Sequence, residues 1–145
     1  MTEKPLFTPQ TEWTVPIIFP DLRDRKEISI DLETKDPFLK SHGSGSIVGR
    51  GCVTGIAVAI EGWAGYYPIA HEGGGNMDKK TVLKWLKEVL LTKADKIFHN
   101  AMYDVCWLRA MGFKINGRII DTMIATSLID ENRGRYDLNS VCKDY

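Results

Sequence analysis

The sequence predicts an α/β domain whose mixed sheet of about five strands is flanked by helices. Three strand-like segments come first, an amphipathic helical segment follows, and short apolar runs then alternate with helical ones. This order is typical of a mixed sheet with helices packed on it. The expected strands are 27–33, 52–62, 64–71, 96–99 and 117–120. The expected helices are 78–91, 101–111, 121–130 and 137–145.

The first 25 residues are expected to form an extended lead-in on the surface of a domain that spans 26–145. Pro5, Pro9, Pro16 and Pro20 disfavour both helix interiors and sheet ladders.

The first strand, 27–33, is predicted by alternation, because Ile28, Ile30 and Leu32 are interleaved with three polar residues. The second and third strands are joined by Glu61-Gly62-Trp63, which has the length of a hairpin loop. The remaining two strands are short apolar runs between helices.

The helix at 78–91 gathers its apolar side chains on one face, and Asp78 is suited to cap its N terminus. The next helix, 101–111, has Asn100 as its expected N-cap and ends before Gly112. The last two helices are separated by the sequence NRGR.

Residues 34–51 are expected to form a flexible surface loop. The stretch GSGSIVGRG at 43–51 is rich in glycine, but it lacks the G-x-x-x-x-G-K-[ST] pattern of a phosphate-binding loop and no helix is expected after it. Lys35, Lys40 and Arg50 flank the stretch, so contact with single-stranded DNA remains open.

Composition places the chain among ordinary globular domains. It has 145 residues, 43% hydrophobic and 26% charged, which suits about one domain with a substantial core. The 19 basic and 19 acidic residues cancel, so overall charge gives no support for tight electrostatic binding of nucleic acid. No apolar run approaches the ~20 residues of a membrane span, and the start lacks a signal-peptide core. Three scattered cysteines indicate thiols in a reducing compartment.

Two carboxylates close the first strand. Asp31 and Glu33 stand at i and i+2, so they project from the same face of the strand while Leu32 faces the core. Ionised acids this close repel each other unless one is protonated or a cation lies between them. Mg²⁺ and Mn²⁺ prefer such oxygen ligands. By itself, D-x-E also fits a strand end that runs into a solvated acidic loop.

A third acid is harder to explain structurally. Asn100, Tyr103 and Asp104 share one face of the helix at 101–111, and Asp104 is a lone acid among apolar residues. Tyr103 alone would fit a half-buried helix aromatic. Asp121 follows an apolar run and opens the next helix, so we favour a capping role for it.

These segments resemble a known family. IDLET at 30–34 and HNAMYD at 99–104 resemble the first two motifs of the DEDD 3′–5′ exonucleases. GYYPIAH at 65–71 and the segment at 121–141 resemble one branch, the proofreading domain of family A (polymerase I-like) DNA polymerases, in particular phage-encoded members. The likeness runs from about Pro16 to the last residue and implies a ribonuclease H-like fold.

The resemblance implies roles for matching residues. Asp31, Glu33 and Asp104 would hold two divalent cations, Mg²⁺ or Mn²⁺, one activating the attacking water and the other stabilising the leaving 3′ oxygen. No side-chain general base is implied. The residues implied to contact the 3′-terminal nucleotide are Leu32, Thr34, Asn100 and Tyr103.

One motif of the family is missing. The family's third motif, Y-x-x-x-D, supplies a tyrosine that orients the water and a fourth carboxylate. Tyr136 is followed four residues later by Ser140, and Tyr145 is the last residue. We therefore expect an exonuclease domain that is incomplete at its C terminus, carried by a longer polymerase and weakly active or inactive as an isolated chain. The alternative is a short protein that borrows the acid from a partner.

The implied partners are the single-stranded 3′ end of DNA and the rest of the polymerase chain, with no membrane. The implied location is the cytoplasm, that of the host if a phage encodes the protein. Two other functions remain open: a catalytically silent nucleic-acid-binding domain of the same fold, and an exonuclease of the RNase D-like or helicase-linked kind.

Overall fold

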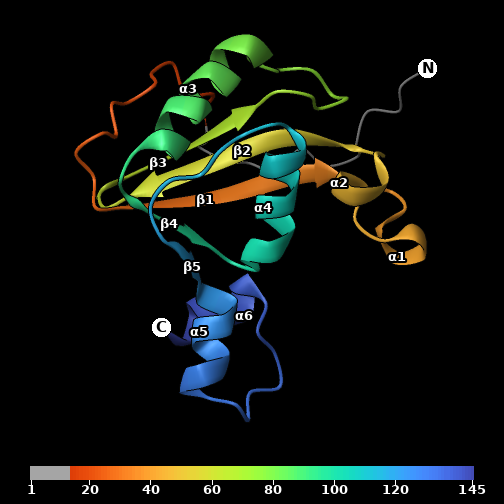
Figure 1. The fold of residues 1–145 in the computed structure, drawn as a ribbon, viewed down its shortest axis with the longest axis vertical. Coiled ribbons are helices and arrows are strands. Elements are labelled where there is room, and N and C mark those ends of the chain that lie inside the picture. The colour runs from red at the N-terminus through yellow and green to blue at the C-terminus, as the bar shows by residue number, and fades with distance from the viewer. Residues whose placement is uncertain (1–13) are drawn as a thin grey trace.

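Five strands form one mixed sheet in the order β3-β2-β1-β4-β5 (Figure 1). The computed structural model describes residues 14–145. The strands are β1 (Glu27–Lys35), β2 (Cys52–Ile60), β3 (Trp63–Pro68), β4 (Asp95–Phe98) and β5 (Ile119–Asp121). The helices are α1 (Leu39–His42), α2 (Gly45–Val48), α3 (Lys79–Leu91), α4 (Ala101–Ala110), α5 (Thr122–Ile129) and α6 (Leu138–Asp144). The five predicted strands and the four predicted helices are confirmed within a few residues at their ends.

The sheet joins an antiparallel half to a parallel half. β1, β2 and β3 pair as a meander, while β4 pairs parallel to β1 and β5 parallel to β4. A parallel strand cannot follow a tight turn, so the chain crosses over through α3 before it enters β4. The N-cap prediction for α3 is confirmed, because Asp78 accepts a hydrogen bond from the backbone N–H of Thr81.

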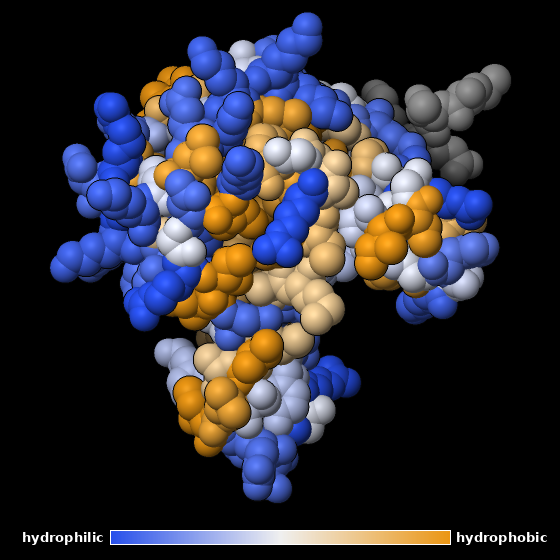
Figure 2. Space-filling view, in the orientation of Figure 1, coloured by the Kyte–Doolittle hydropathy of each residue, from blue (hydrophilic) through white to orange (hydrophobic). Residues whose placement is uncertain are grey.

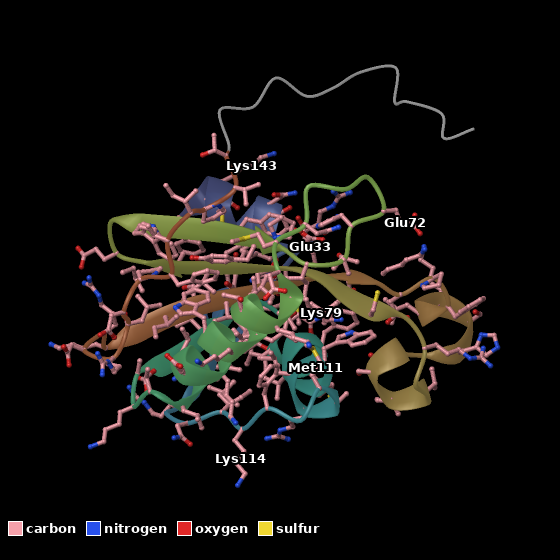
Figure 3. All side chains as sticks on the ribbon, turned by 90° about the horizontal axis from the view of Figure 1, so that it is seen from above. Glu33, Glu72, Lys79, Met111, Lys114 and Lys143 are labelled. Carbon is pink, nitrogen blue, oxygen red and sulfur yellow. The ribbon has the colours of Figure 1, made fainter. Side chains whose placement is uncertain are left out.

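One face of the sheet carries the hydrophobic core. Ile28 and Ile56 are fully buried there, and Leu86 and Leu90 of α3 are equally buried against them. α3 and α4 lie on this side of the sheet, whereas α5 and α6 lie on the other side (Figure 3). We call these two sides the packed face and the open face.

The fully buried side chain of Lys96 links backbone segments around the parallel half of the sheet. The ammonium of Lys96 donates to the backbone carbonyls of Thr92, Ala94 and Asn116 at 2.7–3.0 Å. These three bonds use all three donors of the ammonium, which offsets much of the cost of burying the charge. Burial still lowers the pKa of Lys96 below its ordinary value.

Part of the N-terminal lead-in contributes to the hydrophobic core. Residues 1–13 of the expected lead-in lie outside the described residues, and 14–26 contain no helix or strand, as expected. Leu22, however, is buried, and Phe19 stacks on Tyr67 with ring centroids 5.3 Å apart. The expectation that this segment lies on the surface is therefore wrong for these two residues, because Leu22 is part of the hydrophobic core and Phe19 packs against it.

The expectation of a loop at 34–51 is also wrong in part. β1 continues to Lys35, and the glycine-rich stretch forms the short helices α1 and α2. A side chain at position 45 would meet the carbonyl oxygen of Arg50 at 1.9 Å, so only glycine fits where the chain folds back on itself. Glycine here permits tight packing rather than flexibility.

Candidate active site

Asp31 and Glu33 emerge from the middle of the sheet on the open face. Asp31 is paired with Ala57 of β2 and Glu33 with Gly55, so small residues stand beside both acids. The register shifts by one residue between Glu33 and Thr34. A bulge of this kind re-aims the side chains that follow it. Asp31 is half-buried. Glu33 is exposed and is labelled near the middle of the molecule in Figure 3.

Asp104 approaches the same strand from α4. Its side chain is 3% exposed, and its Oδ1 accepts a hydrogen bond from the backbone N–H of Leu32 at 3.2 Å. Burial, reinforced by the charge of Asp31, raises the pKa of Asp104 from 3.8 to about 7. Asp121 and Glu33 add smaller contributions in the same direction. The acids are therefore close enough to oppose each other's ionisation.

His99 lies beside this group of acids. Burial raises the pKa of Asp31, and the charge of His99 acts against that shift. One ring nitrogen of His99 is 3.0 Å from the hydroxyl of Thr122 and the other is 2.7 Å from the carbonyl of Tyr136. A ring nitrogen facing a carbonyl oxygen must carry the proton, so Nε2–H donates to Tyr136 and the ring is held in one orientation.

Asp121 positions the helix that carries Asp104. Its carboxylate accepts hydrogen bonds from the backbone N–H groups of Asn100 and Ala101, at the start of α4, and of Met123 and Ile124, in α5. The predicted capping role is confirmed and extends to two helices. The predicted side-chain cap by Asn100 is wrong, since that residue adopts a left-handed conformation (φ 64°) and its side chain makes no capping bond. The carboxylate is the better partner for a helix N terminus.

Three polar side chains form a chain of hydrogen bonds beside the acids. The hydroxyls of Thr34 and Tyr103 are 2.8 Å apart, and Tyr103 donates to Oδ2 of Asp36 at 3.1 Å. The same oxygen accepts the backbone N–H of Gly45 at 2.9 Å, which connects the site to α2. Sequence analysis missed Asp36. An Asp before Pro37 is typical of a turn, and only its spacing of three residues from Glu33 pointed to the site.

Tyr66 covers the site on the side of β2. Its ring crosses Gly55, where a side-chain carbon would lie 1.9 Å from the Tyr66 hydroxyl. That hydroxyl bonds to Nε2 of His71. Burial raises the pKa of Tyr66, and the charges of Glu33 and Asp31 raise it further. Gly55 therefore makes room for an aromatic side chain next to the carboxylates.

The acids fit divalent cations by donor type. Asp31, Glu33 and Asp104 offer carboxylate oxygens, the ligands that Mg²⁺ and Mn²⁺ prefer. Within residues 14–145, no three Asp, Glu, His or Cys side chains converge as a formed metal site.

A groove on the open face begins at Asp31. It has a volume of about 400 Å³ and is mostly apolar. Its lining includes Ser29, Ala57, Ala59 and Ile97 from the sheet and Leu138 from α6. Figure 2 shows further apolar surface on the lobe formed by α5. The acids thus lie at the border between this apolar groove and the polar chain that ends at Asp36.

With this geometry described, comparison with known proteins identifies the family. The family model of the 3′–5′ exonuclease of family A DNA polymerases matches residues 7–145. The chain belongs to this exonuclease family. It is 34% identical, over 97% of its length, to a DNA-directed DNA polymerase of Pseudomonas phage M6. It is 32% identical, over 64% of its length, to DNA polymerase I of Pseudomonas aeruginosa. The resemblance inferred from the motifs is confirmed.

The chain matches only part of these relatives. It spans 22% of the phage polymerase and 11% of the bacterial one. Among solved structures, NrnC of Brucella melitensis with bound Mg²⁺ matches with a TM-score of 0.59 and 22% sequence identity, covering 86% of this chain and 56% of that chain. Together with the strand order, this likeness confirms the predicted ribonuclease H-like fold. In the described part of the chain, no helix has the length and apolar character needed to cross a membrane.

Proposed function

We propose that this member of the exonuclease family is the proofreading part of a family A DNA polymerase and hydrolyses the 3′-terminal phosphodiester of single-stranded DNA. One observation carries the proposal: Asp104, buried against β1, has a pKa of about 7 because burial and the charge of Asp31 oppose its ionisation. The geometry supports the same conclusion, because this lone buried acid of α4 is bonded to the backbone N–H of Leu32, between Asp31 and Glu33 of β1.

Asp31, Glu33 and Asp104 would hold two divalent cations, Mg²⁺ or Mn²⁺. Bound there, the cations would supply an activated water and stabilise the leaving 3′ oxygen. The chain contributes the placement of the three acids. Leu32 donates its backbone N–H to Asp104 and so orients that carboxylate, and the two strand acids project from one face because they are two residues apart.

The 3′-terminal nucleotide would lie against the ends of β1 and α4. Thr34 and Tyr103 present hydroxyls there, and exposed Asn100 stands at the start of α4. Leu32 offers its backbone, because its side chain is buried in the packed face. The proposed partners are a single-stranded DNA 3′ end and the remainder of a polymerase chain, in the cytoplasm of the cell or of a phage host.

The 145-residue chain alone is proposed to act weakly or not at all. Two-metal hydrolysis needs both cations held firmly against the scissile phosphate, and misplacement by ~1 Å costs roughly 100-fold in rate. The tyrosine and the fourth carboxylate of the family's third motif are not found among the 145 residues, so Asp31, Glu33 and Asp104 supply an incomplete set of ligands.

The test is a comparison of the chain with a chimera. Residues 1–145 replace the matched segment of the Pseudomonas phage M6 polymerase, and a 5′-labelled oligonucleotide is incubated with Mg²⁺ or Mn²⁺. We expect the chimera to shorten the oligonucleotide from its 3′ end and the isolated chain to act at least roughly 100-fold more slowly. The control chimera carries Ser29→Ala, on the same strand face but without a ligand group.

The decisive variant is Asp31→Ala in the chimera. Loss of shortening in this variant, with full activity in the Ser29→Ala control, supports the exonuclease. Equal shortening by the chimera and the Asp31→Ala chimera would contradict it. Binding of the oligonucleotide without any shortening would favour the catalytically silent alternative, and preferred shortening of an RNA strand would favour the RNase D-like one.

A further inference from the structure

Asp36 has a contact pattern that packing does not explain. Its Oδ2 accepts two hydrogen bonds, from Tyr103 and from the backbone of Gly45. Its Oδ1 is buried and has no hydrogen-bond partner among residues 14–145. A buried carboxylate oxygen without a partner is costly and requires an explanation. The carboxylate adjoins the site, at the end of the strand that carries Asp31 and Glu33.

The carboxylate determines which way the neighbouring hydroxyls point. A phenol has a single proton, and a carboxylate can only accept, so Tyr103 gives its proton to Asp36. The 2.8 Å contact between Thr34 and Tyr103 then has one possible direction, in which Thr34 is the donor. The Thr34 proton is therefore directed to the oxygen of Tyr103 and the Tyr103 proton to Asp36, so only lone pairs remain for a ligand.

We propose that Asp36 is a positioning residue that converts the hydroxyls of Thr34 and Tyr103 into an acceptor site for the 3′-hydroxyl of the terminal nucleotide. The proposal rests on the proposed exonuclease function and adds to it a residue that acts through Tyr103. A sugar hydroxyl donates a proton and matches the site. A terminus without that hydroxyl leaves the two acceptors without a donor, and a 3′-phosphate offers only acceptors.

Local structure holds Asp36 in place for this role. The backbone N–H of Leu39 donates to the carbonyl of Asp36, and Gly45 at the start of α2 donates to its side chain. A side-chain carbon at Gly45 would come within 2.9 Å of Oδ1. The start of α1 therefore fixes the backbone of Asp36, and the start of α2 fixes its carboxylate.

The experiment measures binding of single-stranded oligonucleotides to the 145-residue chain with Mg²⁺, by fluorescence anisotropy. One oligonucleotide ends in a 3′-hydroxyl and the other in a 3′-hydrogen, and both carry a terminal phosphorothioate so that the end persists. We expect the wild type to prefer the 3′-hydroxyl by about tenfold, the worth of a good hydrogen bond. Asp36→Ala should reduce that preference to near unity.

Two further variants separate positioning from mere folding. In Asp36→Asn the amide oxygen can still accept from Tyr103, so the preference should largely return. In a Tyr103→Phe background, Asp36→Ala should change the preference no further, because its effect passes through the tyrosine hydroxyl. If Asp36 had only a structural role, Asp36→Ala would weaken binding of both oligonucleotides equally. The same loss would appear in the Tyr103→Phe background.

The outcomes distinguish the two proposals. A wild type that prefers the 3′-hydroxyl while Asp36→Ala keeps the same preference would overturn the role of Asp36 and leave the exonuclease standing. A wild type that binds neither oligonucleotide, together with an inactive chimera, would overturn the exonuclease and this inference with it. A wild type that binds both equally would overturn this inference alone.

Discussion

The two faces of the sheet differ in the residues that they carry. On the packed face, the side chains of Ile30 and Leu32 of β1 are buried in the hydrophobic core. On the open face, the alternate residues of the same strand are Ser29, Asp31 and Glu33, which border an apolar groove and a set of mutually repelling acids. One strand thus serves a core on one side and a site on the other.

This difference shows where stability and function separate. The packed face gains free energy from apolar area removed from water, which is not affected by pH or metal ions. Among the acids, the raised pKa values of Asp31 and Asp104 mean that their ionisation opposes folding. We therefore expect substitutions on the packed face to change stability alone, and substitutions among the acids to change the response to pH and to metal.

The largest effect is expected from Leu86→Ala on the packed face. Leu86 is fully buried in α3, so its truncation leaves a cavity and should lower the free energy of unfolding by about 3 kcal/mol. Urea unfolding followed by circular dichroism measures the loss. Ser29→Ala, on the open face of β1, is the matched control and should stay within about 0.5 kcal/mol of the wild type. Similar losses in both variants would contradict the contrast between the faces.

Asp104→Asn should give a smaller effect of opposite sign. The folded-state pKa of Asp104, about 7, lies above its ordinary 3.8, so the folded chain holds a proton that the unfolded chain releases between these values. Stability is therefore expected to fall as pH rises from about 4 to about 7. Asn remains neutral and still accepts from Leu32, so the variant should melt a few degrees higher than the wild type at about pH 8.

The pH profile is the check on Asp104. The melting temperatures of Asp104→Asn and the wild type should converge below about pH 4, where both side chains are neutral. A lower melting temperature for the variant at about pH 8 would show that the carboxylate serves packing or capping. A constant difference at all pH values would show that its pKa is not raised.

The smallest effect is expected from metal binding to the chain alone. Asp31 and Glu33 project from the same face of β1 as proposed ligands, so Mn²⁺ should stabilise the wild type by about 1.4 kcal/mol at roughly ten times its dissociation constant. Asp31→Ala should lose most of this gain, as well as the heat of Mn²⁺ binding in a calorimetric titration. Equal heats for the two proteins would refute a shared site, whereas Ser29→Ala should match the wild type.

Particular residues show which features of the site can be predicted from the sequence. Alternation along β1 predicted that Asp31 and Glu33 share a face, because a strand has a strict period of two. Helical spacing predicted that Tyr103 and Asp104 meet one surface. Their approach to β1 from α4, a segment distant along the chain, depends on the parallel pairing of β4 with β1, which local pattern does not encode.

The sequence by itself determined the fold class and the order of its elements and pointed to the candidate acids, because periodicity and motif spacing are local properties. Only the tertiary structure decided that Asp121 caps two helices, that α2 folds against Asp36 and that Thr34, Tyr103 and Asp36 form one chain of hydrogen bonds. These contacts join segments distant in sequence. Hydrogen-bond direction and pKa depend on every group around an atom, so they emerge only when the chain is packed.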